Sequence, residues 1–87
     1  MNKYERLAAV LNEAKAIMES EKISNFVLID LDRPESIEVL LNGKQPDADT
    51  ILTETKRGSI CENGRTKQYV DRFGRVGGVK FTATAVA

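Results

Sequence analysis

Residues 2–32 read NKYERLAAVLNEAKAIMESEKISNFVLIDLD, and the spacing of apolar residues changes within this stretch in a way that decides the fold. The first part carries apolar side chains every three or four residues, which is typical of an amphipathic helix. Asn2 and Glu5 are spaced as in a capping box, so we expect the helix to begin there and to fray from Glu21 to Ser24. The apolar stripe of this helix consists of Tyr4, Leu7, Leu11, Ala14 and Met18.

The second part of the stretch, residues 26–32, is a short run of large apolar and β-branched residues. This composition predicts a central strand of a sheet. Residues 34–43 fit a helical turn, because Pro and Gly bound them, and also fit a strand, because their apolar residues alternate. We favour a strand that forms a hairpin with residues 26–32. The alternating residues are Ile37, Val39 and Leu41.

Turn signals divide the rest of the chain into further short strands. Residues 43–49 predict a loop, and Asn63-Gly64 predicts a type I′ hairpin turn because both residues tolerate a positive φ. A second glycine-centred turn is predicted at residues 74–78. The remaining strands are expected at residues 50–56, 59–61, 66–73 and 79–86.

These elements predict a single α+β domain over residues 1–87. One N-terminal amphipathic helix is expected to pack on a four- to five-stranded, mainly antiparallel sheet, because its apolar face needs a covering layer. The facing residues would be Leu7, Leu11 and Met18 on the helix and Leu28, Ile29 and Phe81 on the sheet. Free sheet edges predict a monomer or a weak homodimer that pairs through a terminal strand.

The composition excludes several classes of chemistry. The 87 residues include no histidine and one cysteine, Cys61, which rules out histidine triads, histidine-ligated zinc and an internal disulfide. A lone cysteine is typical of a reducing compartment, and no apolar run reaches the roughly 18 residues of a membrane span. The N-terminus also lacks the apolar core of a signal peptide. We therefore expect a cytoplasmic, non-enzymatic protein with no catalytic residue, cofactor, metal or membrane contact.

Two further motifs favour structural interpretations. The D-x-D pairs Asp30/Asp32 and Asp47/Asp49 could ligate a hard cation, but neither continues into an EF-hand, so we interpret them as solvated turn residues. Residues 74–80 read GRVGGVK and are glycine-rich like a phosphate loop. They lack the Walker A spacing, which favours a flexible hairpin turn.

Charge is divided unevenly along a chain whose net charge is zero. Residues 1–55 hold six basic and eleven acidic side chains, whereas residues 56–87 hold seven basic and two acidic ones. Such a division either neutralises itself within the fold or forms a surface for an acidic partner. The predicted partner-binding residues are Lys67, Arg72, Arg75 and Lys80, with Arg75 exposed in a turn.

Two hypotheses for the partner follow from this division. The leading one is another protein with an acidic surface, which the chain would occupy as an inhibitor or adaptor of the kind that phages and mobile elements encode. The alternative is nucleic acid or a nucleotide, because Tyr69, Phe73 and Phe81 lie among the cations and could stack on bases. The same aromatic residues could instead pack in the fold.

Overall fold

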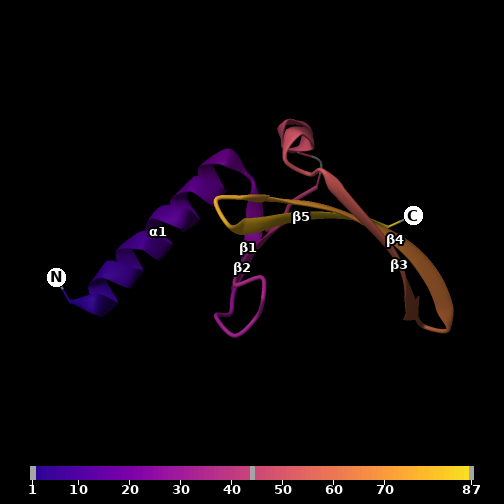
Figure 1. Cartoon of the computed structure of the whole chain (residues 1–87), viewed down its shortest axis with the longest axis horizontal. Coiled ribbons are helices and arrows are strands. Elements are labelled where there is room, and N and C mark those ends of the chain that lie inside the picture. The colour runs from indigo at the N-terminus through magenta and orange to yellow at the C-terminus, as the bar shows by residue number, and fades with distance from the viewer. Residues whose placement is uncertain (1, 44, 87) are drawn as a thin grey trace.

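The computed structural model describes residues 2–43 and 45–86, which form one helix, one 3-10 helix and a five-stranded sheet (Figure 1). The α+β class with an N-terminal helix and a mainly antiparallel sheet is thereby confirmed. The elements are α1 (Lys3–Glu21), β1 (Ser24–Ile29), β2 (Ile37–Leu41), η1 (Pro46–Thr50), β3 (Glu54–Glu62), β4 (Arg65–Val76) and β5 (Val79–Val86).

Both ends of α1 form where the sequence predicts them. The side chain of Asn2 accepts a hydrogen bond from the backbone N–H of Glu5 at 2.9 Å, which satisfies one of the free donors of the first turn. At the other end Lys22 adopts a left-handed conformation with φ 53° and closes the helix. The predicted helix start and the predicted end at Glu21 are confirmed, although the helix is closed by a cap at Lys22 and does not fray over residues 21–24.

The strands lie in the order β1-β2-β5-β4-β3. Strands β2 and β5 are parallel, and every other neighbouring pair is antiparallel. The favoured strand within residues 34–43 and its hairpin with the preceding strand are confirmed. The prediction that residues 26–32 form a central strand is wrong, because β5 pairs with the far side of β2 and leaves β1 at an edge of the sheet.

Two loop predictions need correction. Residues 43–49 contain the start of η1, since Pro46 has the φ that begins a 3-10 or α-helical turn, and the following strand starts at Glu54 rather than at residue 50. The turn predicted at residues 74–78 is confined to Gly77 and Gly78, whose φ values are 58° and 81°. Two positive φ values define a type I′ turn, so a two-residue loop suffices and Arg75 lies within β4.

The predicted type I′ turn at the other hairpin is confirmed. Asn63 and Gly64 have φ values of 52° and 73°, and they join β3 to β4 directly after the pair Glu62 and Arg65. This turn ends a long two-stranded ribbon that carries the candidate site.

The core is small and lies where η1 covers the sheet. Among the described residues, the buried apolar ones are Val39, Ala48 and Leu52, and no side chain is fully buried. The close approach of η1 requires Gly74 in β4, because a Cβ there would overlap the carbonyl oxygen of Ile51. Residues of η1 and the segment after it thus occupy part of the sheet face that α1 was expected to cover.

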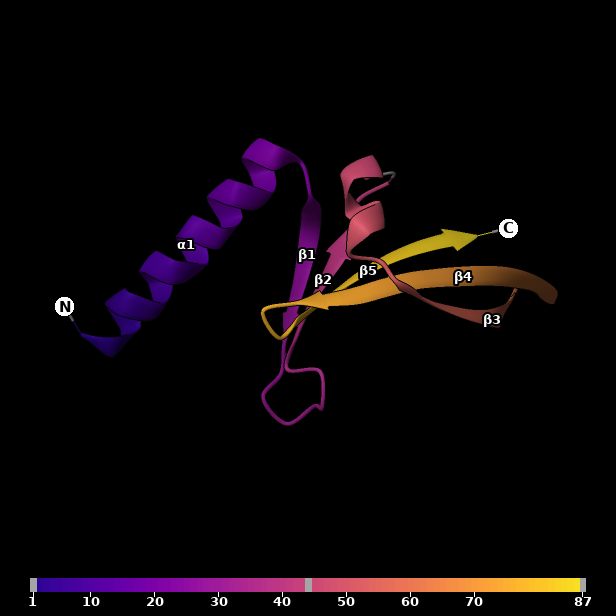
Figure 2. The ribbon, with the colours of Figure 1, turned by 45° about the horizontal axis from the view of Figure 1, so that its top comes forward.

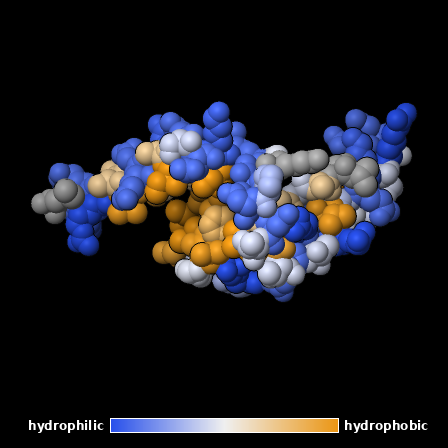
Figure 3. All heavy atoms as spheres, turned by 90° about the horizontal axis from the view of Figure 1, so that it is seen from above, coloured by the Kyte–Doolittle hydropathy of each residue, from blue (hydrophilic) through white to orange (hydrophobic). Residues whose placement is uncertain are grey.

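Helix α1 leaves the sheet at an angle and contacts it through β1 (Figure 2). Within the described part of α1 no residue is buried, and Leu7 and Leu11 are 59% and 45% exposed. The expectation that the sheet covers Leu7 and Leu11 is therefore wrong, whereas Met18 is partly buried. Figure 3 shows hydrophobic atoms gathered along one side of the helix and around a hollow beside it.

The molecule is elongated as a result. Its principal extents are 51 × 28 × 22 Å, and its radius of gyration of 15.3 Å exceeds the roughly 12 Å of a compact chain of this length. Helix α1 forms one end of the long axis, and the hairpin of β3 and β4 forms the other (Figure 1).

Candidate functional site

The four predicted basic residues lie on β4 and β5, and each of them pairs with an acidic side chain of the fold. The ion pairs are Arg72 with Asp49 at 2.9 Å, Lys67 with Glu62 at 3.7 Å, Lys80 with Glu38 at 3.8 Å, and Arg75 with both Glu54 at 3.3 Å and Glu35. Three of the four draw their acidic partners from residues 35–54, so much of the charge division is neutralised between the two parts of the chain. These three residues do not form one free basic surface.

Arg75 has the most acidic surroundings of the four. Its guanidinium donates hydrogen bonds to Glu35 and to Glu54, which join β4 to the β1–β2 loop and to the start of β3. The hydrogen bond from Arg75 holds the pKa of Glu35 below its ordinary value of 4.5, and the charges of Arg75, Lys80 and Arg33 act in the same direction. The same hydrogen bond raises the pKa of Arg75. The geometry therefore gives Arg75 a structural role, as the residue that ties β4 to the β1–β2 loop and to the start of β3.

A different set of cations is displayed on the hairpin of β3 and β4. Strand β5 pairs with β4 only as far as Tyr69, and the hairpin continues beyond that point as a two-stranded ribbon. Every residue from Ser59 to Gln68 is exposed. We call residues 56–67 the basic arm, because they carry four cations and one acidic residue: Lys56, Arg57, Arg65 and Lys67 against Glu62.

The cations of the basic arm lie on both faces of the ribbon. In the strand register Arg65 stands opposite Glu62 and Lys67 opposite Ile60, which puts both cations on one face together with Lys56. Arg57 stands opposite Val70 on the other face. Lys56, Arg57 and Arg65 form no ion pair with any described residue, and the Lys67 pair is exposed and weak. The arm is thus a ribbon with accessible positive charge on each side.

Of these four cations, Lys67 alone is among the partner-binding residues predicted from the sequence. Cations that alternate with aromatic residues in the last third of the sequence indicated Arg72, Arg75 and Lys80 instead. The signal that could have found the arm is the Asn63-Gly64 turn with cations on both sides of it, because a tight hairpin tip is solvent-exposed.

The aromatic residues of this region pack within the fold. Tyr69 lies across Gly58 on the neighbouring strand, where a Cβ would overlap its ring, and Phe73 lies under the ammonium of Lys80 at 4.8 Å from the ring centroid. Tyr69, Phe73 and Phe81 are all partly buried. This arrangement favours the packing interpretation of these residues over the base-stacking one.

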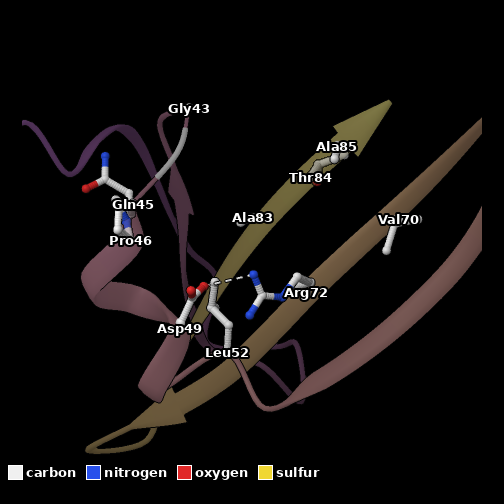
Figure 4. A pocket seen from close by; sticks show the side chains of 10 residues that line it. All are labelled: Gly43, Gln45, Pro46, Asp49, Leu52, Val70, Arg72, Ala83, Thr84 and Ala85. Carbon is white, nitrogen blue, oxygen red and sulfur yellow. Dashed lines mark hydrogen bonds and ion pairs between the residues drawn. The ribbon is translucent and has the colours of Figure 1, made fainter. Parts of the chain in front are cut away.

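A shallow groove of about 520 Å³ runs between η1 and the strands β4 and β5 (Figure 4). Its floor includes Val70, Ala83 and Ala85, and the Arg72–Asp49 ion pair crosses it beside Leu52. The groove is open and mostly apolar, with few polar groups that converge on one point. It therefore lacks the features that mark a specific small-molecule site.

One aspartate of each D-x-D pair accepts a hydrogen bond or forms an ion pair within the fold. Asp30 accepts a hydrogen bond from the backbone N–H of Asp32 at 3.0 Å, which is an Asx turn, and Asp49 pairs with Arg72. No group of three or more potential metal-ligating side chains occurs among residues 2–43 and 45–86. Over the same residues, no helix is long and apolar enough to span a membrane.

Comparison of the chain with protein-family models, with curated proteins and with solved structures finds no match. The basic arm, through its geometry and its charge, is the feature from which a function can be inferred.

Proposed function

We propose that the chain is a non-catalytic binding protein whose basic arm engages an acidic segment of another protein, as an inhibitor or adaptor would. The observation that carries the proposal is the projection of the arm beyond β5 with four cations and one acidic residue on an exposed ribbon. Positive charge on a projecting element attracts acidic partners and raises their rate of association. The exposed single Cys61 on this arm fits a reducing compartment such as the cytoplasm.

The backbone of β3 supports a protein partner. In the described chain β3 pairs with β4 alone, so the outer edge of a nine-residue strand presents free N–H and C=O groups. An extended peptide can add to such an edge, with main-chain hydrogen bonds that give affinity and side chains that give specificity. Lys56 and Arg57 lie on this strand, and Ile60, which is 44% exposed, offers an apolar contact between the cations.

Nucleic acid is the second candidate, and the shape of the arm favours it in one respect. The major groove of DNA admits a two-stranded β-ribbon, and cations on both faces of a ribbon could reach both phosphate backbones. Glu62 and Asp71 share the face of Lys56, Arg65 and Lys67, and they would repel phosphates as they would repel carboxylates, so they do not distinguish the two candidates. However, the packed aromatic residues leave no stacking platform on the arm.

The proposal is tested by reversing two arm charges and two charges elsewhere. Arg57→Glu/Arg65→Glu changes the net charge by the same amount as the control Lys15→Glu/Lys22→Glu on and next to α1. Proteins retained from host extract by the immobilised chain should be lost with the arm variant and kept with the control. The affinity of a protein identified in this way should fall at least tenfold in the arm variant, as for charge pairs at an interface.

Two results would contradict the proposal. If the arm variant and the wild type retained the same proteins from the extract, the arm charges would serve only to keep the folded chain soluble. Binding to a 20-base-pair DNA duplex that persists near 150 mM salt and is lost in the arm variant would favour nucleic acid instead, with a salt slope of about 0.9 per phosphate neutralised.

A further inference from the structure

The apolar face of α1 is left uncovered in the folded chain. Its stripe alternates steps of three and four residues, which is the spacing of helices that pack against another helix. The large apolar side chains of α1 that are most exposed include Tyr4, Leu7 and Leu11 of the stripe. Val10 and Ile17, which lie beside the stripe, are exposed as well. A helix of 19 residues that contacts the rest of the fold only through β1 gains little of the tertiary packing from which most helices in proteins take their stability. The stripe therefore requires an occupant.

The accessible surface of the whole chain is larger than that of a compact monomer of the same mass. The accessible surface is 6958 Å², whereas a compact monomer of 9.6 kDa exposes about 5,100 Å². The excess of about 1,900 Å² is more than twice the roughly 800 Å² that each partner buries in a standard interface. The exposed face of α1 contributes to this excess together with the basic arm.

The charges along α1 say which occupant fits. Residues 3–12 carry two basic and one acidic side chain, and residues 13–21 carry one basic and three acidic ones. An antiparallel second copy of the helix brings the basic half of each chain beside the acidic half of the other. This arrangement also opposes the two helix dipoles favourably. A parallel copy would place like halves side by side.

The side-chain sizes match the same arrangement. If two antiparallel helices cross at Leu11, Tyr4 of one copy lies opposite Met18 of the other, and Leu7 lies beside Ala14. A large side chain then meets a small one in that layer, and the two Leu11 side chains meet on the two-fold axis. The contact is isologous and closes at two copies.

We infer that the chain forms a homodimer in which two α1 helices pack antiparallel through the stripe of Tyr4, Leu7, Leu11, Ala14 and Met18. The inference is independent of the proposed function, because the basic arm lies at the opposite end of the molecule (Figure 1). The dimer places the two arms at its far ends, free of the helix interface.

The first test measures mass in solution and one substitution on the axis. Sedimentation equilibrium of the full chain at micromolar concentration should give about 19 kDa, twice the mass of the chain. Leu11→Glu sets two like charges against each other on the axis and should weaken association at least tenfold. The matched control Leu31→Glu changes a residue that is 82% exposed and outside the stripe, and should leave association unchanged.

The second test fixes the orientation and does not depend on the stability of a charge variant. In a Cys61→Ser background, Leu11→Cys should form a disulfide-linked dimer on mild oxidation. Tyr4→Cys should not, because two Tyr4 positions lie about 21 Å apart along antiparallel helices. Cross-linking by both variants would indicate parallel helices and overturn the arrangement. A wild-type mass of 9.6 kDa, or no cross-link at position 11, would overturn the dimer.

Discussion

Ion pairs between single residues join the two oppositely charged parts of the chain. The contribution of the Arg75–Glu35 pair to stability can be tested by protonating the carboxylate of Glu35. Arg75 holds the pKa of Glu35 below 4.5, so the ionised carboxylate stabilises the folded state above that pH. This stabilisation is lost as pH falls through the lowered pKa. Glu35→Gln should therefore lower the melting temperature at pH 7, and its effect should shrink as the pH falls below 4.5. Thermal unfolding followed by circular dichroism over this pH range measures the effect.

The control for this prediction removes the partner. In an Arg75→Gln background, Glu35→Gln should shift the melting temperature at pH 7 less than it does in the wild type, because the largest cause of the lowered pKa is gone. A melting difference between Glu35→Gln and wild type that is as large at pH 3 as at pH 7 would contradict the account.

At the scale of elements, the packing of η1 on the sheet depends on how closely the segment after η1 approaches β4. Gly74 sets that distance. A Cβ at position 74 would overlap the carbonyl oxygen of Ile51, which is backbone next to the buried Leu52. Gly74→Ala must push this segment away and should reduce the free energy of unfolding by about 1–3 kcal/mol, as overpacking does. Urea unfolding measures the loss.

Gly58→Ala is the matched comparison on the neighbouring strand. There the added Cβ meets the ring of Tyr69, a side chain at the partly exposed surface that can rotate away. Its cost should be the smaller of the two. If Gly74→Ala proved no more destabilising than Gly58→Ala, the close packing of η1 on the sheet would be wrong.

Contacts between neighbours in the chain could be predicted from the sequence, whereas contacts between distant residues could not. The capping of α1 by Asn2, the β1–β2 hairpin and the Asn63-Gly64 turn depend on neighbours in the chain, and local patterns predict all three. The parallel pairing of β2 with β5 depends on residues about 40 positions apart, as does the Arg75–Glu35 pair. No local pattern records these contacts. The position of β1 at the edge of the sheet and the exposure of α1 follow from them.

The candidate site was predicted in part for the same reason. The excess of cations in residues 56–87 is visible in the sequence, and Lys67, one of the predicted partner-binding residues, lies on the exposed arm. Which cations are neutralised depends on the acidic side chains that the fold brings to them, such as Asp49 beside Arg72. The sequence shows the number of charges but not their partners.

At the scale of the whole molecule, the proposed dimer links the stability of a chain with so small a core to its concentration. If the α1 stripe is buried in that dimer, unfolding must also dissociate the two copies, and the melting temperature should depend on concentration. A hundredfold rise in chain concentration should raise the melting temperature of the wild type by roughly 5–10 °C. Leu11→Glu should melt lower and at a temperature that does not change with concentration, while Leu31→Glu should follow the wild type. Differential scanning calorimetry at two concentrations distinguishes these results, and a wild-type melting temperature that is independent of concentration would mean that the exposed stripe contributes nothing to the stability of the fold.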